Sequence, residues 1–312
     1  MNSDHRPFFS VLITSYNRPN YIAECVESVL ANEGQDYELI ISDDASPSSS
    51  AVEAAMHAPA AAPSWSDEFD GTTLDLRKWS YDTSHNKSGW FNGELQYYAA
   101  KRPENLRVAD GKLIIEARKD GDSLRSRSDW GGQHYSSAKI QTKGKADFRY
   151  GFVEVRAKLP CSVGTWPAIW MMPEGNAPWP EGGEIDIMEH VGSQPHVVHG
   201  TLHTKLFNHQ IHTGRGAETP VPTSCEAFHR YQLDWQPHVM TIGVDDRAYM
   251  QVRDDQPGGR GAWPFNTPFY LILNLALGGD WAAPKGMDDA ALPQRFEVDY
   301  VRVWSLQVGE RG

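Results

Sequence analysis

The pattern of apolar residues along the chain changes near residue 55. Before that point, residues 8–14 form a continuous apolar run, and a second run lies within residues 37–46. Runs of this kind are typical of buried strands. Between them, apolar residues recur at helical spacing from Ile22 to Leu30. The order of strand, helix and strand predicts one βαβ unit with parallel strands.

This unit is too small to cover both faces of its own sheet. It is followed by residues 46–63, which are rich in Ser, Ala and Pro and are typical of a linker. We therefore expect a βαβ fragment over residues 1–50, a linker over 51–63 and a second domain over 64–307.

The second domain has a different pattern, made of short apolar runs separated by Gly, Pro, Asn and Asp. Within residues 153–159, for example, apolar and charged residues alternate, as in a strand with one buried face. Many short strands with such punctuation over about 240 residues favour a single antiparallel sandwich or barrel. The predicted fold class is all-β, preceded by the small βαβ fragment.

Charge and hydropathy narrow the range of partners. The chain has 29 basic and 41 acidic residues, a net charge of −12. This balance argues against nucleic acid or an anionic membrane as the main partner, and no apolar run is long enough to span a bilayer. The eleven Trp and twelve Tyr residues either fill the core or form a surface that stacks against sugar rings.

Two further features bear on the compartment. The three cysteines, Cys25, Cys161 and Cys225, have no spacing typical of a metal knuckle or a redox pair. They allow at most one disulfide bond, and we expect free thiols. The apolar run near the N-terminus is short and has no cleavage site after it, so no signal peptide is expected.

The segment Gly-Gly-Glu-Ile-Asp-Ile-Met-Glu-His brings three carboxylates close together: Glu184, Asp186 and Glu189. Strict alternation puts Glu184 and Asp186 on one face of a strand but turns Glu189 to the buried face, where a lone carboxylate is costly. A one-residue β-bulge at Ile187 or Met188 returns Glu189 to the face of the other two. We therefore predict a bulge there.

With that bulge, the Cα atoms of Glu184 and Glu189 are about 13 Å apart at about 3.3 Å per residue. Their side chains can lean together until the carboxyl groups are about 5 to 5.5 Å apart, the separation used by retaining glycosidases. One Glu would attack the anomeric carbon while the other protonates the leaving oxygen, and Asp186 would bond to the nucleophile. A solvated acidic strand on the surface is the alternative interpretation of the same segment.

The residues around this segment resemble glycoside hydrolase family 16. The motifs are "GTWPAIWMMPEG", "WPEGGEIDIMEHVG", "DEFDGTTLDLRKW", "WFNGELQYY", "YGFVEVRAKLP", "HGTLHT", "PFYLILNLALGGDW" and "VDYVRVW", and the likeness runs from about residue 65 to 307. Met188 resembles the extra residue of the family's bulged subgroup, and the chain is most similar to its laminarinases. The resemblance implies a β-jelly-roll sandwich with a concave substrate cleft.

The resemblance also implies roles for individual residues. Glu184 would be the nucleophile, Glu189 the acid/base and Asp186 the assisting acid. The cleft would be lined by seven further residues: Trp90, Asn92, Glu94, Trp166, Trp170, His203 and Trp281. For Trp170 a pure core role, and for His203 a scaffold role, remain open.

No cofactor is expected for catalysis. Many members of the family carry a structural Ca²⁺, and the matching positions here are Glu68, the carbonyl of Gly111 and Asp299. Oxygen ligands suit calcium, but three unrelated surface groups are the alternative.

The expected function is endo-acting, retaining hydrolysis of 1,3-linked β-glucan by a monomeric enzyme, with mixed-linkage 1,3-1,4-β-glucan as an alternative substrate. A non-catalytic β-glucan-binding protein is the alternative of a different class. Residues 8–45 resemble the start of a family 2 glycosyltransferase, but the rest of that domain, with its metal-binding acidic motif, is missing. Transferase activity is therefore not expected. Polymeric glucan is met outside the cell, so the route of export stays open.

Overall fold

The computed structural model describes residues 9–15, 37–43, 55–284 and 286–306. The chain divides into two compact units, Met1–Ala54 and Ala55–Gly312. In the first unit, strands β1 (Phe9–Ser15) and β2 (Tyr37–Asp43) pair in parallel, which confirms the predicted arrangement of the two strands. The helix predicted between them lies outside the described residues.

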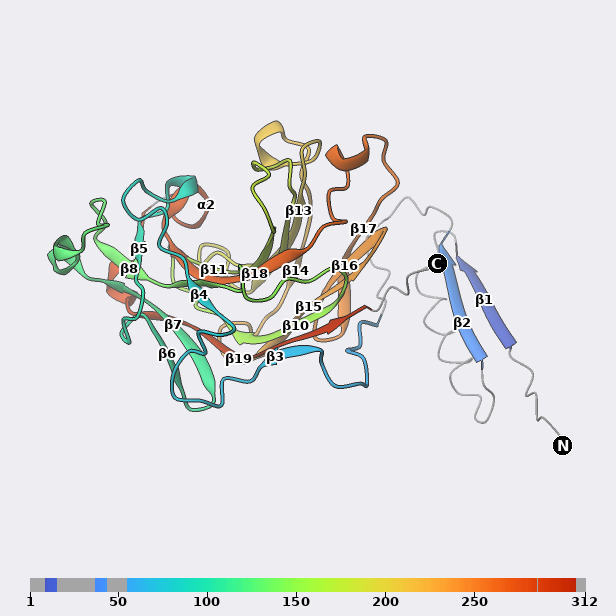
Figure 1. The fold of residues 1–312 in the computed structure, drawn as a ribbon, viewed down its shortest axis with the longest axis horizontal. Helices are drawn as coiled ribbons and strands as arrows, with labels where there is room; N and C mark the ends of the chain where they lie inside the picture. Colours follow the sequence, from blue (N-terminus) through green and yellow to red (C-terminus); the bar gives the residue numbers. More distant parts are fainter. Residues whose placement is uncertain (1–8, 16–36, 44–54, 285, 307–312) are drawn as a thin grey trace. The chain divides into compact units, whose positions relative to one another are not determined.

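The second unit is a sandwich of two sheets, and Figure 1 shows β11 and β18 lying over β10 and β19. The ten-stranded sheet contains β3 (Trp65–Asp67), β5 (Gln96–Tyr98), β6 (Leu106–Ala109), β7 (Lys112–Lys119), β8 (Tyr135–Ser137), β10 (Gly151–Lys158), β15 (His229–Gln236), β16 (Val239–Val244), β17 (Arg247–Arg253) and β19 (Gln294–Ser305). The seven-stranded sheet has the order β14 (Arg215–Pro220), β13 (Val197–His203), β12 (Glu184–Glu189), β11 (Thr165–Pro173), β18 (Phe269–Leu277), β9 (Lys139–Gln141) and β4 (Ser80–Tyr81).

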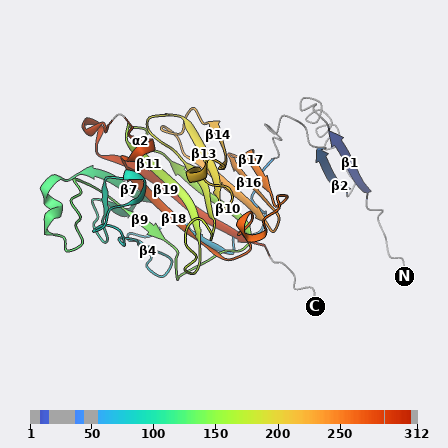
Figure 2. The ribbon, with the colours of Figure 1, turned by 90° about the horizontal axis from the view of Figure 1, so that it is seen from above.

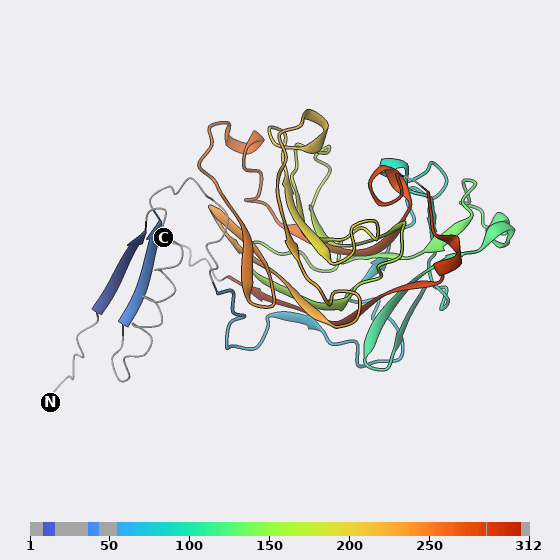
Figure 3. The same cartoon turned by 180° about the vertical axis from the view of Figure 1, so that it is seen from behind.

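Helical segments in this unit are short and lie in the loops. They are η1 (Phe91–Gly93), η2 (Gly121–Ser126), η3 (His209–Ile211), η4 (Gly259–Gly261), α2 (Gly279–Ala282) and η5 (Asp289–Ala291). Figures 1 and 3 show the seven-stranded sheet curving toward the side on which α2, η3 and η4 stand. Seen from above, the strands of the two sheets run broadly alongside one another (Figure 2). No helix among the described residues is both long and apolar enough to cross a membrane.

The core lies between the two sheets. The alternation predicted for residues 153–159 holds, because Val153, Val155 and Ala157 on β10 are almost completely buried. They belong to the same cluster as Ile185 of β12 and Leu273 of β18, from the other sheet. The all-β prediction is confirmed as a two-sheet sandwich. One face of the seven-stranded sheet packs on the core, and its other face lies outside the core.

The predicted linker differs from the structure at its end. Ala55 pairs with Arg247 at the start of β17, and the backbone N–H of Met56 donates to the carbonyl of Asp246 over 2.8 Å. The Met56 side chain is only 4% exposed. It occupies the space beside Gly243, where a Cβ atom would lie 2.4 Å from its sulfur. Ala55 and Met56 belong to the second unit because the apolar side chain of Met56 is buried there. The abundance of Ser, Ala and Pro around Met56 makes this single apolar residue easy to overlook in the sequence.

The expectation of free thiols is wrong for two of the three cysteines. Cys161 and Cys225 form a disulfide bond, with their Cα atoms 5.8 Å apart. The reason is strand pairing: β10 and β15 are antiparallel, with Ala157 opposite His229, so the residues just after β10 meet those just before β15. Sequence spacing alone does not contain that pairing. Cys25 lies outside the described residues.

Candidate active site

The bulge predicted in β12 is present. Against β11, Met188 pairs with Ile169 and Asp186 with Trp170, so Ile187 has no partner. Against β13, the register also shifts between Asp186 and Glu189. Ile185, Ile187 and Met188 are buried in the core between the sheets. The three acids therefore share the outer face of the seven-stranded sheet, as expected from the cost of burying Glu189 alone.

Each of the three carboxyl groups has a specific neighbour. The indole N–H of Trp179 donates to Oε2 of Glu184 over 2.7 Å. The indole N–H of Trp166 donates to Oε1 of Glu189 over 3.0 Å. On the central acid, Oδ2 of Asp186 lies 3.3 Å from Nε2 of His203.

The acids sit in a poorly solvated cluster that opposes ionisation. Asp186 is 2% exposed, while the two glutamates are half-buried. Burial, followed by the charge of Glu184, raises the pKa of Glu189 to about 7. Burial, followed by the charge of Asp186, raises the pKa of Glu184 to about 8. Burial also raises the pKa of Asp186 well above its usual value. Three negative charges cannot coexist here, so the cluster holds protons near neutral pH.

Aromatic rings surround the Glu189 end of the cluster. Trp166 and Trp281 meet edge to face, with ring centroids 5.1 Å apart. Trp281 also contacts His199, at 4.9 Å between centroids, and His199 pairs with Glu189 across the strands. Two of the predicted cleft residues, Trp166 and Trp281, are thus next to one another and to the acids.

A second aromatic group lies further along the same face. The ammonium group of Lys139 sits 4.8 Å from the ring centre of Trp90 and 4.9 Å from that of Trp170. The indole N–H of Trp170 donates to Oδ1 of Asn274 over 2.7 Å. Because Trp170 is half-buried on the outer face, it is not a pure core residue.

The segment around η1 approaches the acids from the loops. The backbone of Glu94 forms an isolated antiparallel β-bridge with Gly278. Its side chain accepts a hydrogen bond from the side chain of Gln96 over 2.8 Å. Burial raises the pKa of Glu94, and its charge adds to the rise at Glu189. Asn92 is exposed and has a φ of 58°, a conformation that asparagine tolerates better than most residues.

The residues proposed for calcium have other partners. Glu68 accepts two hydrogen bonds from the guanidinium of Arg302, over 3.0 and 2.7 Å, and Asp299 pairs with Arg156. Gly111, with a φ of 69°, lies in the turn between β6 and β7. A carboxylate held by arginine is poorly suited to a cation, so the arrangement does not fit calcium and we assign the ion no role.

Sequence reasoning missed two neighbours of the acids. His199 had a signal, because alternation along β13 puts it on the same face as His203. Trp179 opens the motif "WPEGGEIDIMEHVG", but the motif assigned it no role, because it lies in the loop before β12 and reaches Glu184 only through the fold of that loop.

Comparison with known proteins agrees with this geometry. Residues 93–302 match the model of glycosyl hydrolases family 16, and residues 10–66 match that of glycosyl transferase family 2. A β-glucanase of Rhodothermus marinus is 48% identical over 249 residues, covering 77% of this chain and 84% of the relative. A glucan endo-1,3-β-glucosidase of Cryptopygus antarcticus is 36% identical, covering 77% and 91%.

Solved structures are similar over the same region. A non-specific endo-β-1,3(4)-glucanase, crystallised as a variant presenting a 1,3-β-D-cellobiosyl-glucose at its active site, matches with a TM-score of 0.78 and 53% identity, covering 81% of this chain and 98% of that one. The laminarinase of Rhodothermus marinus matches with a TM-score of 0.72 and 46% identity, covering 78% and 97%. Enzymes of this family need no cofactor for catalysis. The jelly-roll sandwich and the bulged acidic strand agree with these matches, and the chain belongs to glycosyl hydrolase family 16.

Proposed function

We propose that this protein is an endo-β-1,3-glucanase of the laminarinase type that hydrolyses its substrate with retention of configuration. The observation that carries the proposal is the bulge in β12, which leaves Glu184, Asp186 and Glu189 on one face. The names of its relatives support the substrate class, since they include β-1,3-glucanases and laminarinases.

In this mechanism Glu184 attacks the anomeric carbon and forms a glycosyl-enzyme, while Glu189 donates its proton to the leaving oxygen. Glu189 suits this task because its pKa is raised to about 7, which keeps it protonated below that pH. Glu189 then accepts a proton from the water that releases the sugar.

Glu184 must be ionised when it attacks, although its surroundings raise its pKa. Asp186 resolves this by staying protonated and donating a hydrogen bond to the carboxylate of Glu184. The repulsion between the two groups then vanishes and a hydrogen bond to the carboxylate replaces it. The N–H of Trp179 supplies a second donor to the same carboxylate. Trp166 and Trp281 would stack against sugar rings beside Glu189.

The test is release of reducing sugar from laminarin, with the anomeric configuration of the first product followed by NMR. The wild type should release the β-anomer, and Glu184→Gln should release no sugar. Glu181→Gln is the matched control, because Glu181 is an exposed acid three residues away that pairs with Lys205. Full activity in Glu184→Gln, or the α-anomer from the wild type, would contradict the mechanism.

Two alternatives have specific support. Mixed-linkage hydrolysis is favoured by the 1,3(4)-glucanase among the similar structures, and a panel of laminarin, mixed-linkage glucan and cellulose distinguishes it. Glucan binding without turnover is favoured by a β-1,3-glucan-binding protein of Penaeus monodon, 33% identical over 239 residues. Tight laminarin binding with no sugar released would support that second alternative.

A further inference from the structure

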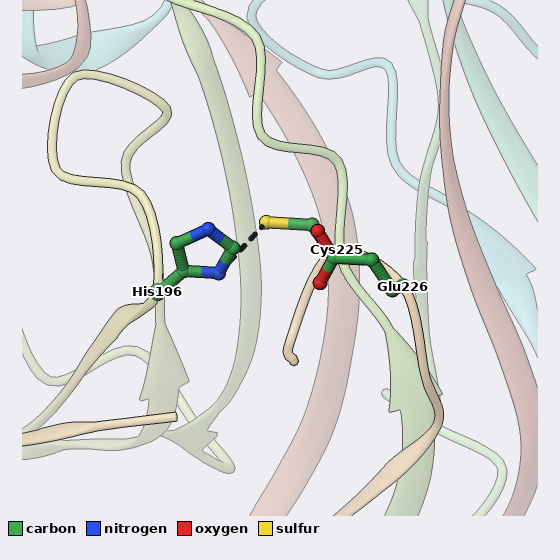
Figure 4. Close-up of side chains that lie close together, drawn as sticks. All are labelled: His196, Cys225 and Glu226. Carbon is green, nitrogen blue, oxygen red and sulfur yellow. Dashed lines mark hydrogen bonds between the residues drawn. The ribbon is translucent and has the colours of Figure 1, made fainter. Parts of the chain in front are cut away.

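The disulfide bond between Cys161 and Cys225 lies among groups that could bind a metal. Nδ1 of His196 lies 3.4 Å from the sulfur of Cys225. The nearest ligand atoms of His196, Cys225 and Glu226 all lie within 4.8 Å of one another, and Figure 4 shows the three side chains gathered around the sulfur. Cys161, bonded to Cys225, adds a second sulfur at the same place.

The distance between His196 and Cys225 matches one edge of a zinc site. In a tetrahedral site with Zn–S of about 2.3 Å and Zn–N of about 2.0 Å, sulfur and nitrogen ligands are about 3.5 Å apart. A second imidazole is also close, since Nε2 of His190 lies 3.7 Å from the sulfur of Cys161. His190 is fully buried, and its Nδ1 has no hydrogen-bond partner.

The disulfide can be reached from solvent. Both cysteines line a cavity of about 560 Å³, together with Lys158 and Arg295. A small dithiol can therefore reach the bond. Thiol–disulfide exchange would transfer two electrons and two protons to the cystine, giving two thiols here and a disulfide in the reagent.

We propose that the reduced protein binds one Zn²⁺ ion through the thiolates of Cys161 and Cys225, Nδ1 of His196 and a carboxylate oxygen of Glu226. Binding displaces the two thiol protons. Two cysteines, one histidine and one carboxylate form a closed four-ligand set of the structural type, because no position is left for water.

The position of the site explains what the metal would do. The loop that carries Cys161 packs closely against Gly192, where a Cβ atom would lie 1.8 Å from the carbonyl oxygen of Ser162. The N–H of Gly192 also donates to the carbonyl of Thr165 over 3.0 Å. Gly192 follows Glu189 by three residues. The disulfide therefore joins the segment before β15 to a loop that contacts the residues just after β12, and zinc would keep the same two segments together when the cystine is reduced.

The test is a titration of the full chain with Zn²⁺ alone, after reduction with a phosphine and removal of the reagent. We expect about one ion per reduced chain and none for the oxidised chain. Co²⁺ in place of Zn²⁺ should give a thiolate-to-metal charge-transfer band. His196→Ala and Glu226→Gln should each weaken zinc binding at least about tenfold, and Cys161→Ser/Cys225→Ser should abolish it.

His238→Ala is the matched control, because His238 is an exposed histidine that pairs with Asp254. In the oxidised state, His196→Ala and Glu226→Gln should keep the wild-type unfolding transition and laminarin hydrolysis, which establishes that they fold. The proposal is overturned if the reduced wild type binds no zinc, whether or not the reduced chain stays folded. It is also overturned if Cys161→Ser/Cys225→Ser binds as much zinc as the reduced wild type. Neither result depends on whether the protein cleaves glucan.

Discussion

The indole N–H of Trp179 lies 2.7 Å from Oε2 of Glu184, although Trp179 belongs to the loop before β12 and not to the sheet. This bond stabilises the carboxylate form of the proposed nucleophile. It lowers the pKa of Glu184, whereas burial raises that pKa. The loop thereby acts on the chemistry of the strand that follows it.

Replacing Trp179 with Phe should reduce kcat by about 10- to 100-fold, since a hydrogen bond to a charged group contributes about 1.5–3 kcal/mol. The acidic limb of the pH profile of kcat/KM should also move to higher pH, because Glu184 becomes harder to ionise. Trp170→Phe is the control for the pH profile, since the N–H of Trp170 bonds to Asn274 and not to an acid. An unchanged acidic limb in Trp179→Phe would argue against the role given to this bond.

Trp166→Phe should act on the opposite limb. The N–H of Trp166 lowers the pKa of Glu189, so its loss should raise that pKa. The general acid then stays protonated to higher pH, so the alkaline limb of the kcat/KM profile should move to higher pH. A pH–rate series on laminarin measures this, and a downward shift would contradict it.

Glu184→Gln should be inactive and, above about pH 4, more stable than the wild type. The pKa of Glu184 is about 8 in the fold against an ordinary value of 4.5, so the native state binds more protons than the unfolded state between these values. Wild-type stability therefore falls as pH rises through that window. Glu184→Gln lacks this titration, so its Tm should match the wild type near pH 4 and exceed it increasingly toward pH 8. Equal Tm values at every pH would show that ionisation of the buried Glu184 does not destabilise the native state.

Removing the disulfide should destabilise the fold more than it affects chemistry. The bond closes a loop with a sequence separation of 64, and bonds of this kind contribute about 2–4 kcal/mol to the free energy of unfolding. Cys161→Ser/Cys225→Ser should lose about that much in urea unfolding with a chelator present, with KM for laminarin little changed. An unaltered unfolding midpoint would mean that packing alone holds the loop.

Much of the site could be predicted because its signal is local. The alternation of Ile185 and Ile187 with acids fixes the faces of the strand. The cost of burying Glu189 then requires the bulge that the structure contains. In the same way, apolar alternation along β10 predicted one buried face.

The parts that could not be predicted depend on chain segments that meet only after folding. The partners of Glu68 and Asp299 are arginines on other strands, and their presence removes the basis of a calcium site. The pairing of Cys161 with Cys225 likewise follows from the register of β10 against β15. Composition and spacing hold no information about either.

The burial of Met56 beside Gly243 decides where the polypeptide can be divided. A protease cut or a fusion joint after Met56 would separate this buried side chain from the rest of the unit, and we expect the hydrolase to unfold more readily without Ala55 and Met56. The portable module therefore begins well upstream of residue 93, where the family match starts.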